Sequence, residues 1–192
     1  MDAYPPDAPF YPRHVRGSSS RWLGGCLARM LLVATMTTTA GAVICRAICS
    51  RLTCNLTSSL PRGVYLLRPA APIERGSIVS LVAPEPVRSL IAERRYLPPS
   101  VHLLKRVVAV AGDSACFEHE RYLVNGRLVS AIARRDRAGR PLPAPVPFCG
   151  RVPEGFVSLA GDGRSSLDSR YFGLVSDSTL TPAVPLWTSS SL

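Results

Sequence analysis

The chain has 192 residues, 46% of them hydrophobic, and a mean hydropathy of +0.15, so it is long enough for one domain with a buried core and more apolar than most soluble proteins. Its formal net charge of +10 suits an anionic partner, either nucleic acid or a membrane surface. The arginines are scattered, and no helix-turn-helix, zinc-ligand spacing or aromatic stacking motif occurs, so we expect a membrane-facing protein with no nucleic acid partner.

The N-terminal quarter contains two segments of different composition. Residues 1–21 hold four Pro, three Arg and a Gly-Ser-Ser-Ser run, which is typical of a disordered basic tail. From Trp22 to Cys45 only Arg29 is charged, and a membrane-spanning helix needs about 20 mostly apolar residues. We therefore expect an uncleaved transmembrane anchor over residues 22–46.

Two other interpretations of the apolar segment stay open. The Thr-Ala-Gly-Ala run near residue 40 is compatible with cleavage of a signal peptide. A buried core helix is also compatible with the composition, but it leaves the basic tail unexplained. Arginine is more abundant before the segment than after it, which predicts a cytoplasmic N-terminus and an external remainder. The arginines compared are Arg13, Arg16, Arg21 and Arg29 before the segment, and Arg46 and Arg51 after it.

Past residue 51, short β-branched or aromatic runs bounded by Gly, Pro or Asp are typical of strands. The Asn-Gly pair at positions 125 and 126 predicts a type I′ hairpin, because that turn requires positive φ at both central residues. The expected strands are 63–68, 77–82, 101–110, 122–129 and 156–159, the main helix candidate is 87–96, and 134–147 is expected to be a long exposed loop. The sequence thus predicts a mainly β, antiparallel domain.

The six cysteines divide by location. Cys26, Cys45, Cys49 and Cys54 lie in or beside the apolar segment, whereas Cys116 and Cys149 lie in the expected β domain. If that domain is extracytoplasmic, oxidation is permitted and Cys116 with Cys149 is the natural disulfide pair. Unpaired cysteines that act as small hydrophobic residues are the alternative. No Cys-x-x-Cys spacing occurs, so we expect no metal site.

Lys105 is the only lysine in the chain, against 22 arginines. Arginine stays protonated at any workable pH, whereas a desolvated lysine amine can accept a proton. In a strand, Lys105 shares its face with Leu103 and Val107, while Arg106 points to the other face. Burial among aliphatic groups lowers a lysine pKa from its ordinary value of about 10.4. The pattern favours Lys105 as a general base, and a solvated surface lysine is the alternative.

Ser58 and Ser59 are the candidate nucleophiles, and they precede a Leu-Pro-Arg-Gly run. Pro61 and Gly63 are expected to hold this stretch as a rigid turn. Such a turn can expose a nucleophilic hydroxyl and aim its own N–H at a developing oxyanion. A serine hydroxyl needs a neighbouring base, and a neutral lysine is one such base. A polar turn residue without a catalytic role is the alternative for Ser59.

A third stretch, residues 161–173, reads GDGRSSLDSRYFG. Its small residues suggest tight turns, and Asp162, Arg164, Asp168 and Arg170 suggest a loop held by arginine–carboxylate bonds. By itself this stretch predicts structure and no particular chemistry.

In this order and spacing, the three stretches resemble the sequence boxes of the signal peptidase I superfamily. SSLPRGVY is similar to the nucleophile box, LLKRVVAVAGD to the general-base box, and GDGRSSLDSRYFG to the last box. The resemblance covers residues 52–186 with gaps. The short domain and the Pro-Arg-Gly-Val-Tyr continuation most resemble the TraF-type peptidases, which mature or cyclise the pilin of a plasmid transfer apparatus.

The resemblance implies a role for each matching residue. Ser59 is implied to be the nucleophile, Lys105 the general base, and Asp168 a carboxylate that is implicated in activity in TraF-type enzymes. Thr57 is implied to donate to the oxyanion and Ser166 to orient the lysine. The residues implied to support the structure are Gly161, Asp162, Arg164 and Arg170. The family chemistry needs no metal or organic cofactor.

The chain departs from the family pattern in three ways. Leu60 follows the nucleophile where Met is usual. The last box is one residue shorter than usual, which leaves the alignment of Arg164 and Ser165 open. The large second domain of some signal peptidases has no room here, which weakens a housekeeping role.

These features predict a signal-peptidase-like domain over residues 51–192, on the periplasmic side of a bacterial inner membrane behind a single-pass anchor. The expected function is a Ser/Lys endopeptidase that processes, or cyclises, a conjugative pilin precursor. Expected partners are that precursor or another preprotein, the lipid bilayer, and proteins of the transfer apparatus. The alternatives are a general type I signal peptidase, an inactive scaffold of the transfer pore and, more weakly, nucleic acid binding through residues 134–140.

Overall fold

The computed structural model describes residues 19–85, 87–98, 101–118 and 120–189 of the chain. The chain divides into two compact units, Met1–Ile48 and Cys49–Leu192. Residues 1–18 of the expected basic tail lie outside the described residues. The last part of that tail, from Ser19 to Arg21, is helical, so this part of the prediction is wrong. Its residues include no glycine or proline to prevent the helix from beginning at Ser19.

The first unit contains one long helix, α1 (Ser19–Cys49). Within the described residues, Leu32–Cys49 is long and apolar enough to cross a membrane, with a mean hydropathy of 1.5. The described side chains of this segment are exposed. Threonine hydroxyls of the helix donate to carbonyls three or four residues earlier at 2.8–3.0 Å, so the helix itself satisfies them. These residues are Thr35, Thr37, Thr38 and Thr39.

The second unit consists mostly of strands and the loops between them. Its strands are β1 (Leu52–Asn55), β2 (Gly63–Leu67), β3 (Ile78–Leu81), β4 (Leu103–Ala109), β5 (Ser114–Glu118), β6 (Arg121–Val124), β7 (Arg127–Ala131), β8 (Phe148–Arg151), β9 (Phe156–Ala160), β10 (Val175–Ser176) and β11 (Thr181–Thr188). Its helices are α2 (Val87–Glu93), α3 (Ser169–Phe172) and the 3-10 turn η1 (Asp177–Thr179). All pairings between these strands are antiparallel, which confirms the predicted fold class.

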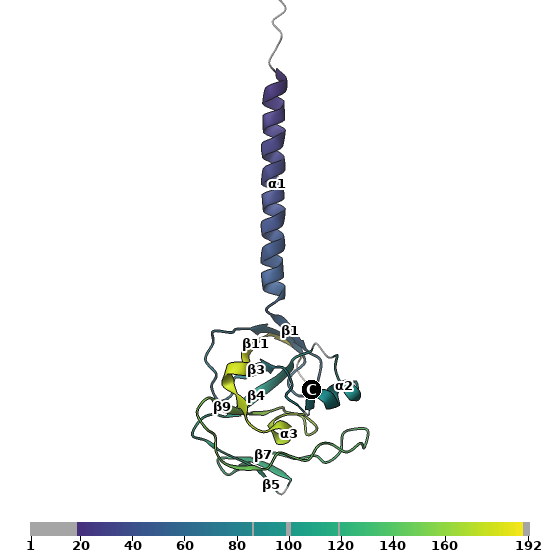
Figure 1. Cartoon of the computed structure of the whole chain (residues 1–192), viewed down its shortest axis with the longest axis vertical. Helices are drawn as coiled ribbons and strands as arrows, with labels where there is room; N and C mark the ends of the chain where they lie inside the picture. The colour runs from purple at the N-terminus through teal and green to yellow at the C-terminus, as the bar shows by residue number, and fades with distance from the viewer. Residues whose placement is uncertain (1–18, 86, 99–100, 119, 190–192) are drawn as a thin grey trace, which may run out of the picture. The chain divides into compact units, whose positions relative to one another are not determined.

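These strands form two sheets. One sheet has seven strands in the order β1-β2-β11-β3-β4-β9-β10, and the other has four in the order β7-β6-β5-β8. Figure 1 shows β1 at one end of this unit and β5 and β7 at the other, with α3 between the two ends. β4 lies between β3 and β9, so a side chain on β4 is flanked by strands on both sides.

From Leu103 to Val107 the side chains of β4 alternate between the two faces of the strand, as the sequence predicts. Leu103 and Val107 belong to the main core, and Leu104 belongs to a smaller cluster on the other face. Lys105 is buried on the face that it shares with Leu103 and Val107, whereas Arg106 is half-buried. This alternation places the lone lysine inside the domain.

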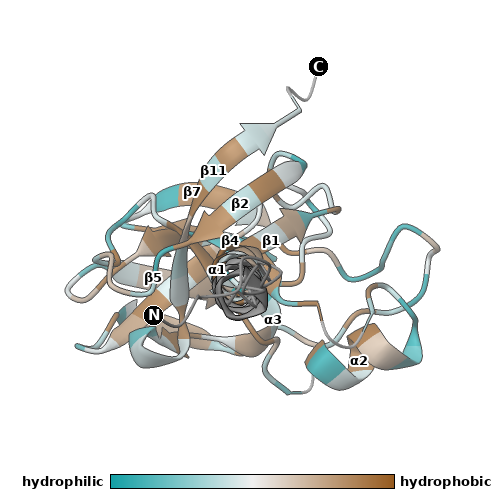
Figure 2. Ribbon diagram, turned by 90° about the horizontal axis from the view of Figure 1, so that it is seen from above, coloured by the Kyte–Doolittle hydropathy of each residue, from teal (hydrophilic) through white to brown (hydrophobic). Residues whose placement is uncertain are grey.

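The helix predicted over residues 87–96 is confirmed as α2, which ends earlier, at Glu93. This short helix carries both hydrophobic and hydrophilic residues (Figure 2). Its Val87 and Ile91 are buried in the main core, while Arg88 and Ser89 are exposed. An amphipathic helix of this kind covers one edge of a core and leaves its polar face in water.

All the predicted strands are confirmed, and several further strands were not predicted: β1, β5, β8, β10 and β11. β11 contains Pro182 and Pro185, and prolines argue against a strand with two neighbours because they donate no ladder hydrogen bond. β11 tolerates them because its first part pairs with β3 and its second part with β2, with a bulge after Pro185. Pro182 contributes its carbonyl, which accepts the N–H of Arg68 at 2.7 Å.

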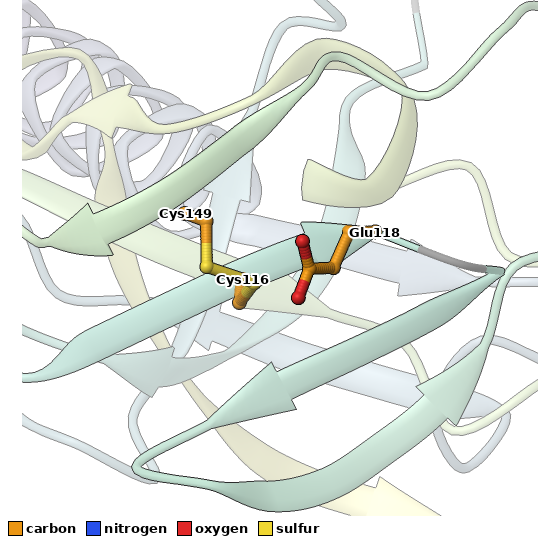
Figure 3. Close-up of side chains that lie close together, drawn as sticks. All are labelled: Cys116, Glu118 and Cys149. Atoms are coloured by element: carbon orange, nitrogen blue, oxygen red, sulfur yellow. A yellow bond between two sulfur atoms is a disulfide. The ribbon is translucent and has the colours of Figure 1, made fainter.

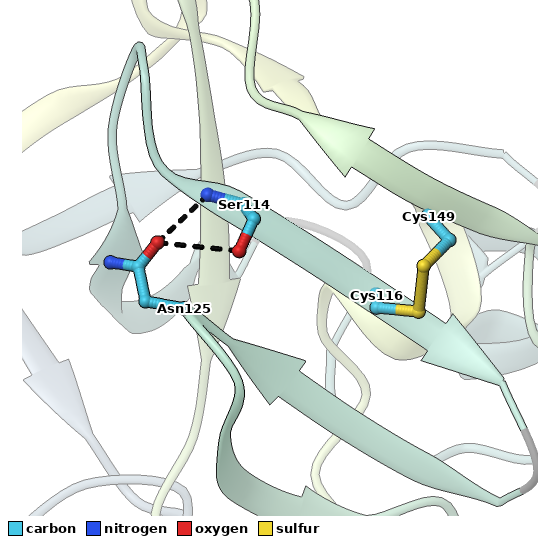
Figure 4. Close-up of a disulfide and its surroundings, with 4 residues drawn as sticks. All are labelled: Ser114, Cys116, Asn125 and Cys149. Atoms are coloured by element: carbon cyan, nitrogen blue, oxygen red, sulfur yellow. Dashed lines mark hydrogen bonds between the residues drawn. A yellow bond between two sulfur atoms is a disulfide. The ribbon is translucent and has the colours of Figure 1, made fainter.

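The predicted hairpin turn is confirmed between β6 and β7. Asn125 and Gly126 have φ values of 50° and 74°, the signs that a type I′ turn requires. The Asn125 Oδ1 accepts from both the backbone N–H and the hydroxyl of Ser114, at 2.9 and 3.3 Å (Figure 4). The turn is thereby tied to the beginning of β5.

Cys116 and Cys149 form a disulfide, which confirms the expected pair (Figure 4). The two residues are direct cross-strand partners on β5 and β8. Glu118 lies beside them, and the three residues bring potential ligand atoms within 4.8 Å of one another (Figure 3). The two sulfurs are bonded to each other, so they offer no thiolate to a metal ion.

Candidate active site

The loop between β1 and β2 is held by one buried amide. Asn55, 5% exposed at the end of β1, donates through Nδ2 to the carbonyls of Thr57, Leu60 and Pro61 at 3.1, 2.8 and 3.2 Å. Its Oδ1 accepts the N–H and the hydroxyl of Thr57 at 3.2 and 2.9 Å. Three carbonyl acceptors on one side fix which end of the amide is nitrogen. Asn55 therefore determines the shape of the loop.

Ser59 lies in this loop and is only 7% exposed. Its Oγ is 2.7 Å from the Oγ1 of Thr57. Because the Thr57 hydroxyl proton is directed at Asn55, Ser59 is the donor in this contact. The N–H of Ser59 also donates to Thr57 Oγ1, over a long 3.4 Å. A weakly engaged N–H of this kind is available to a developing oxyanion.

Lys105 is 3% exposed, and its Nζ donates to the Oγ of Ser166 at 2.7 Å. Burial lowers its pKa from the ordinary lysine value to about 8. The carboxylate of Asp168 opposes this shift, the guanidinium of Arg170 adds to it, and Asp162 opposes it weakly. A lysine in this state can exist as a neutral amine near physiological pH, which a general base requires.

Asp168 and Arg170 form a fully buried ion pair beside the lysine. The Arg170 Nε and Nη2 donate to the two carboxylate oxygens of Asp168 at 2.7 and 2.6 Å. Asp168 also accepts the N–H of Gly161 at 2.8 Å and caps the beginning of α3. The bidentate geometry makes this one of the stronger ion-pair types. Through these contacts the buried ion pair connects Gly161, at the beginning of the last box, to the beginning of α3.

Arg170 also binds the loop that carries Ser166. Its guanidinium donates to the carbonyls of Gly163, Arg164 and Ser166 at 3.3, 3.1 and 3.1 Å. It reaches β7 as well, through the hydroxyl of Ser130 at 2.8 Å and the Ala131 carbonyl at 2.9 Å. The guanidinium thus fixes the position of Ser166, the residue that contacts Lys105.

Gly161 is the point at which the last box meets the stretch that carries Ser59. A Cβ added there would lie 2.2 Å from the Oγ of Ser166 and 2.9 Å from the Cβ of Ser59. The next residue, Asp162, donates its backbone N–H to the carbonyl of Ser59 at 2.7 Å. Only a residue without a side chain allows Ser59 and Ser166 to approach this closely.

A cavity of about 320 Å³ opens over these groups. Its polar lining includes Ser59, Lys105 and Ser166, and its apolar lining includes Ile91 and Leu103. Among the described residues no hydrogen bond joins Ser59 to Lys105: the serine donates to Thr57 and the lysine to Ser166. The site therefore holds a buried hydroxyl and a buried amine in one cavity, each with a different partner.

The remaining expected residues contribute mainly through their backbones. The Asp162 side chain is exposed and lies 3.8 Å from Arg106, so its contribution to the site is its N–H. Arg164 is exposed and contributes its carbonyl to Arg170. Ser58 is also exposed, and its hydroxyl accepts from Arg137.

Sequence reasoning missed two residues of the site. Asn55 is missed because its role depends on five contacts within a single irregular loop, which no periodicity reports. Arg137 is missed because it lies in the Arg- and Pro-rich loop, 79 positions from its partner Ser58. A single sequence carries no signal for such a long-range contact.

The chain matches one family model, described as signal peptidase, peptidase S26, over residues 25–187, a span that includes all three boxes. It is 33% identical over 140 residues to a plasmid transfer protein TraF of Escherichia coli, covering 68% of this chain and 78% of the relative. It is 31% identical to a conjugal transfer protein TraF of Agrobacterium fabrum (66% and 76%) and 35% identical to a probable conjugal transfer protein TraF of Sinorhizobium fredii (75% and 80%). A crystal structure of a signal peptidase I from Enterococcus faecalis matches 59% of this chain and 96% of that chain, with 20% identity and a TM-score of 0.35.

Proposed function

Because the chain belongs to the signal peptidase family, peptidase S26, we propose that it is a membrane-anchored serine endopeptidase in which Ser59 is the nucleophile and Lys105 the general base. The observation that carries this proposal is the burial of the only lysine in one cavity with Ser59, in a setting that lowers the lysine pKa to about 8. Neither group has a carboxylate partner within hydrogen-bond distance among the described residues. An amine in such a setting can be deprotonated at moderate pH.

In the proposed reaction, the hydroxyl of Ser59 rotates from Thr57 toward the neutral Nζ of Lys105, which accepts its proton. The Ser59 Oγ attacks the scissile carbonyl carbon, and the carbonyl oxygen becomes an oxyanion. The C–N bond then breaks, and the leaving amine takes the proton from the Lys105 ammonium. Water, or the amino terminus of the substrate, attacks the acyl-enzyme with Lys105 again as base, and Ser59 regains its proton.

The neighbouring residues prepare these groups and do not themselves react. The Ser59 N–H is the first oxyanion donor, and the Thr57 hydroxyl becomes a second when it turns away from Asn55. Ser166 orients the lysine amine. Asp168 is a positioning residue in this proposal, because its carboxylate is occupied by Arg170 and by the N–H of Gly161.

We propose that the substrate is a conjugative pilin precursor. Support comes from the relatives named for plasmid and conjugal transfer, at 31–35% identity. Attack by water on the acyl-enzyme yields a linear pilin, and attack by the substrate's own amino terminus yields a cyclic one. Proteins of the transfer apparatus are the expected further partners.

For the location, we propose a single-pass inner-membrane anchor formed by α1, with the N-terminus in the cytoplasm and Cys49–Leu192 in the periplasm. The length and hydropathy of Leu32–Cys49 support the span. The disulfide between Cys116 and Cys149 suits an oxidising compartment. Ser59 follows the end of α1 by ten residues, so the site is expected to remain close to the bilayer surface.

The test is to incubate the full-length protein, in membranes, with a conjugative pilin precursor and with an ordinary secretory preprotein. Ser59→Ala and Lys105→Arg should each abolish processing, while Ser178→Ala, an exposed serine of η1, should retain it. The mass of the pilin product separates cyclisation from hydrolysis, because the cyclic product lacks one water. Processing of the preprotein alone would support a general type I signal peptidase, and processing of neither would support an inactive scaffold.

A further inference from the structure

The cavity over Ser59 carries an excess of positive charge. Apart from Lys105, which reacts as a neutral amine, its charged lining consists of Arg137 and Arg140, with Asp136 as the acidic counterpart. The negative charge of Asp136 is already balanced, since Arg140 donates to the carboxylate through Nε at 2.7 Å and Arg94 through Nη1 at 3.4 Å. A cleft lined by unbalanced charge of one sign favours a ligand of the other sign.

The loop that carries these arginines is fastened in place. Asp136 accepts the Tyr96 hydroxyl and, at 2.9 and 2.8 Å, the N–H groups of Ala138 and Arg140. These bonds hold the pKa of the Asp136 carboxyl well below its usual range. Arg94 donates to the carbonyl of Pro141 at 2.7 Å. The loop is thereby held beside the segment that follows α2.

Arg137 differs from Arg140, the other arginine of this loop in the cavity lining. Its Nη2 donates to the hydroxyl of Ser58 at 2.8 Å, and among the described residues no carboxylate pairs with it. Ser58 directly precedes Ser59, so the guanidinium contacts the residue next to the proposed nucleophile. The remaining donors of a planar guanidinium are arranged to bind a carboxylate at two points.

We propose that Arg137 is a specificity-determining residue that binds a carboxylate of the substrate close to the scissile bond. An extended peptide rises about 3.3 Å per residue, so the carboxylate lies within about two residues of that bond. It is either the side chain of an Asp or Glu or the terminal carboxylate of a short leaving peptide. This inference rests on the proposed function, and it adds the chemical character of the substrate.

The test uses peptides that span the cleavage site of a pilin precursor, with Glu or Gln at each of the two positions on either side of the scissile bond. Each peptide is made with a free and with an amidated C-terminus, which separates a side-chain carboxylate from a terminal one. The full-length protein should cleave the best acidic peptide with a kcat/KM about tenfold above its neutral counterpart, mainly through KM. A preference for Glu identifies a side chain, and a preference for the free C-terminus identifies a terminal carboxylate.

Two variants assign this preference to Arg137. Arg137→Gln should reduce the difference between acidic and neutral peptides to less than about twofold, and Arg137→Glu should instead favour a Lys peptide. Arg135→Gln is the matched control, since Arg135 lies in the same loop, donates to the Gly139 carbonyl and is not part of the cavity lining. A wild-type protein that cleaves acidic and neutral peptides equally, or an Arg137→Gln variant that keeps the preference, overturns the inference. Cleavage of no peptide by the wild type contradicts the proposed function, and the inference falls with it.

Discussion

The proposed chemistry depends on the protonation state of one amine. Lys105 is buried by the apolar side chains of β4 and its neighbours, and this burial lowers its pKa to about 8. At pH 7 about a tenth of the molecules then hold the neutral amine, and above pH 8 most of them do. Asp168 raises the lysine pKa, and its pairing with Arg170 limits that effect. The buried ion pair therefore keeps the lysine from becoming a permanent ammonium.

The hydrogen-bond chain from Asn55 through Thr57 to Ser59 leads to a prediction at the level of single residues. Asn55→Ala and Thr57→Val should each lower kcat by about tenfold to a hundredfold, because the serine hydroxyl loses its fixed orientation. If Asn55 acts through Thr57, the double variant should be hardly worse than the poorer single variant. Steady-state kinetics of the four proteins measure this coupling, with circular dichroism to confirm folding. Losses that multiply in the double variant would argue for two independent roles.

The burial of Lys105 could be predicted from the alternation of β4, because a strand with aliphatic neighbours on one face buries whatever lies among them. The partner of that lysine could not be predicted in this way, and Ser166 was expected only from the family resemblance. The contacts of Lys105 with Ser166 and of Ser58 with Arg137 join positions 61 and 79 residues apart, and they depend on how loops pack. Residue types and local period carry no information on such contacts.

At the level of elements, the last box contributes a glycine, Gly161, that allows Ser59 and Ser166 to lie close together. Gly161→Ala should lower kcat by at least about a hundredfold, because its Cβ would collide with Ser166 and Ser59 and displace the reacting groups. Gly150→Ala in β8 is the matched control, since its nearest atom would be 3.8 Å away on Phe148. Peptide hydrolysis by both variants measures the effect. Normal activity of the Gly161 variant would show that Ser59 and the last box do not meet as described.

The disulfide joins β5 to β8 and closes a chain segment that includes the Arg-rich loop. Its sequence separation of 33 residues predicts a contribution of about 3–4 kcal/mol to the free energy of unfolding. The Cys116→Ala/Cys149→Ala variant should therefore unfold about 10 °C lower. Thermal melts with and without a reductant test this, since the reductant should lower the Tm of the wild type and leave that of the double variant unchanged. A reductant-insensitive wild type would contradict the disulfide.

The strands and turns differ in how well they can be predicted from their own local sequence. Strands with β-branched residues, such as β3 and β4, and the Asn125-Gly126 turn follow from local pattern alone. β11 does not, because its prolines are tolerated only where its pairing changes from β3 to β2. β1 and β8 are short, and each is stabilised by one neighbouring strand rather than by its own composition.

At the scale of the whole molecule, the division into two units predicts separable roles. A variant that lacks residues 1–48 keeps the complete Cys49–Leu192 unit and should hydrolyse a soluble peptide with a kcat/KM within about twofold of the full-length protein. It should process a membrane-embedded precursor at least about tenfold more slowly, because the anchor raises the local concentration of enzyme at the bilayer. Equal processing of the membrane-embedded precursor would contradict a role for α1 in presenting the site.

The most direct test of the Ser59–Lys105 assignment is covalent labelling of the full-length protein by a serine-directed acylating reagent, mapped by mass spectrometry across pH 6 to 10. The account predicts a single adduct on Ser59, a labelling rate that rises with pH to a plateau with a midpoint near 8, and loss of labelling in Lys105→Arg. An adduct on another residue, or an unchanged labelling rate in Lys105→Arg, would contradict it, because arginine cannot accept the proton.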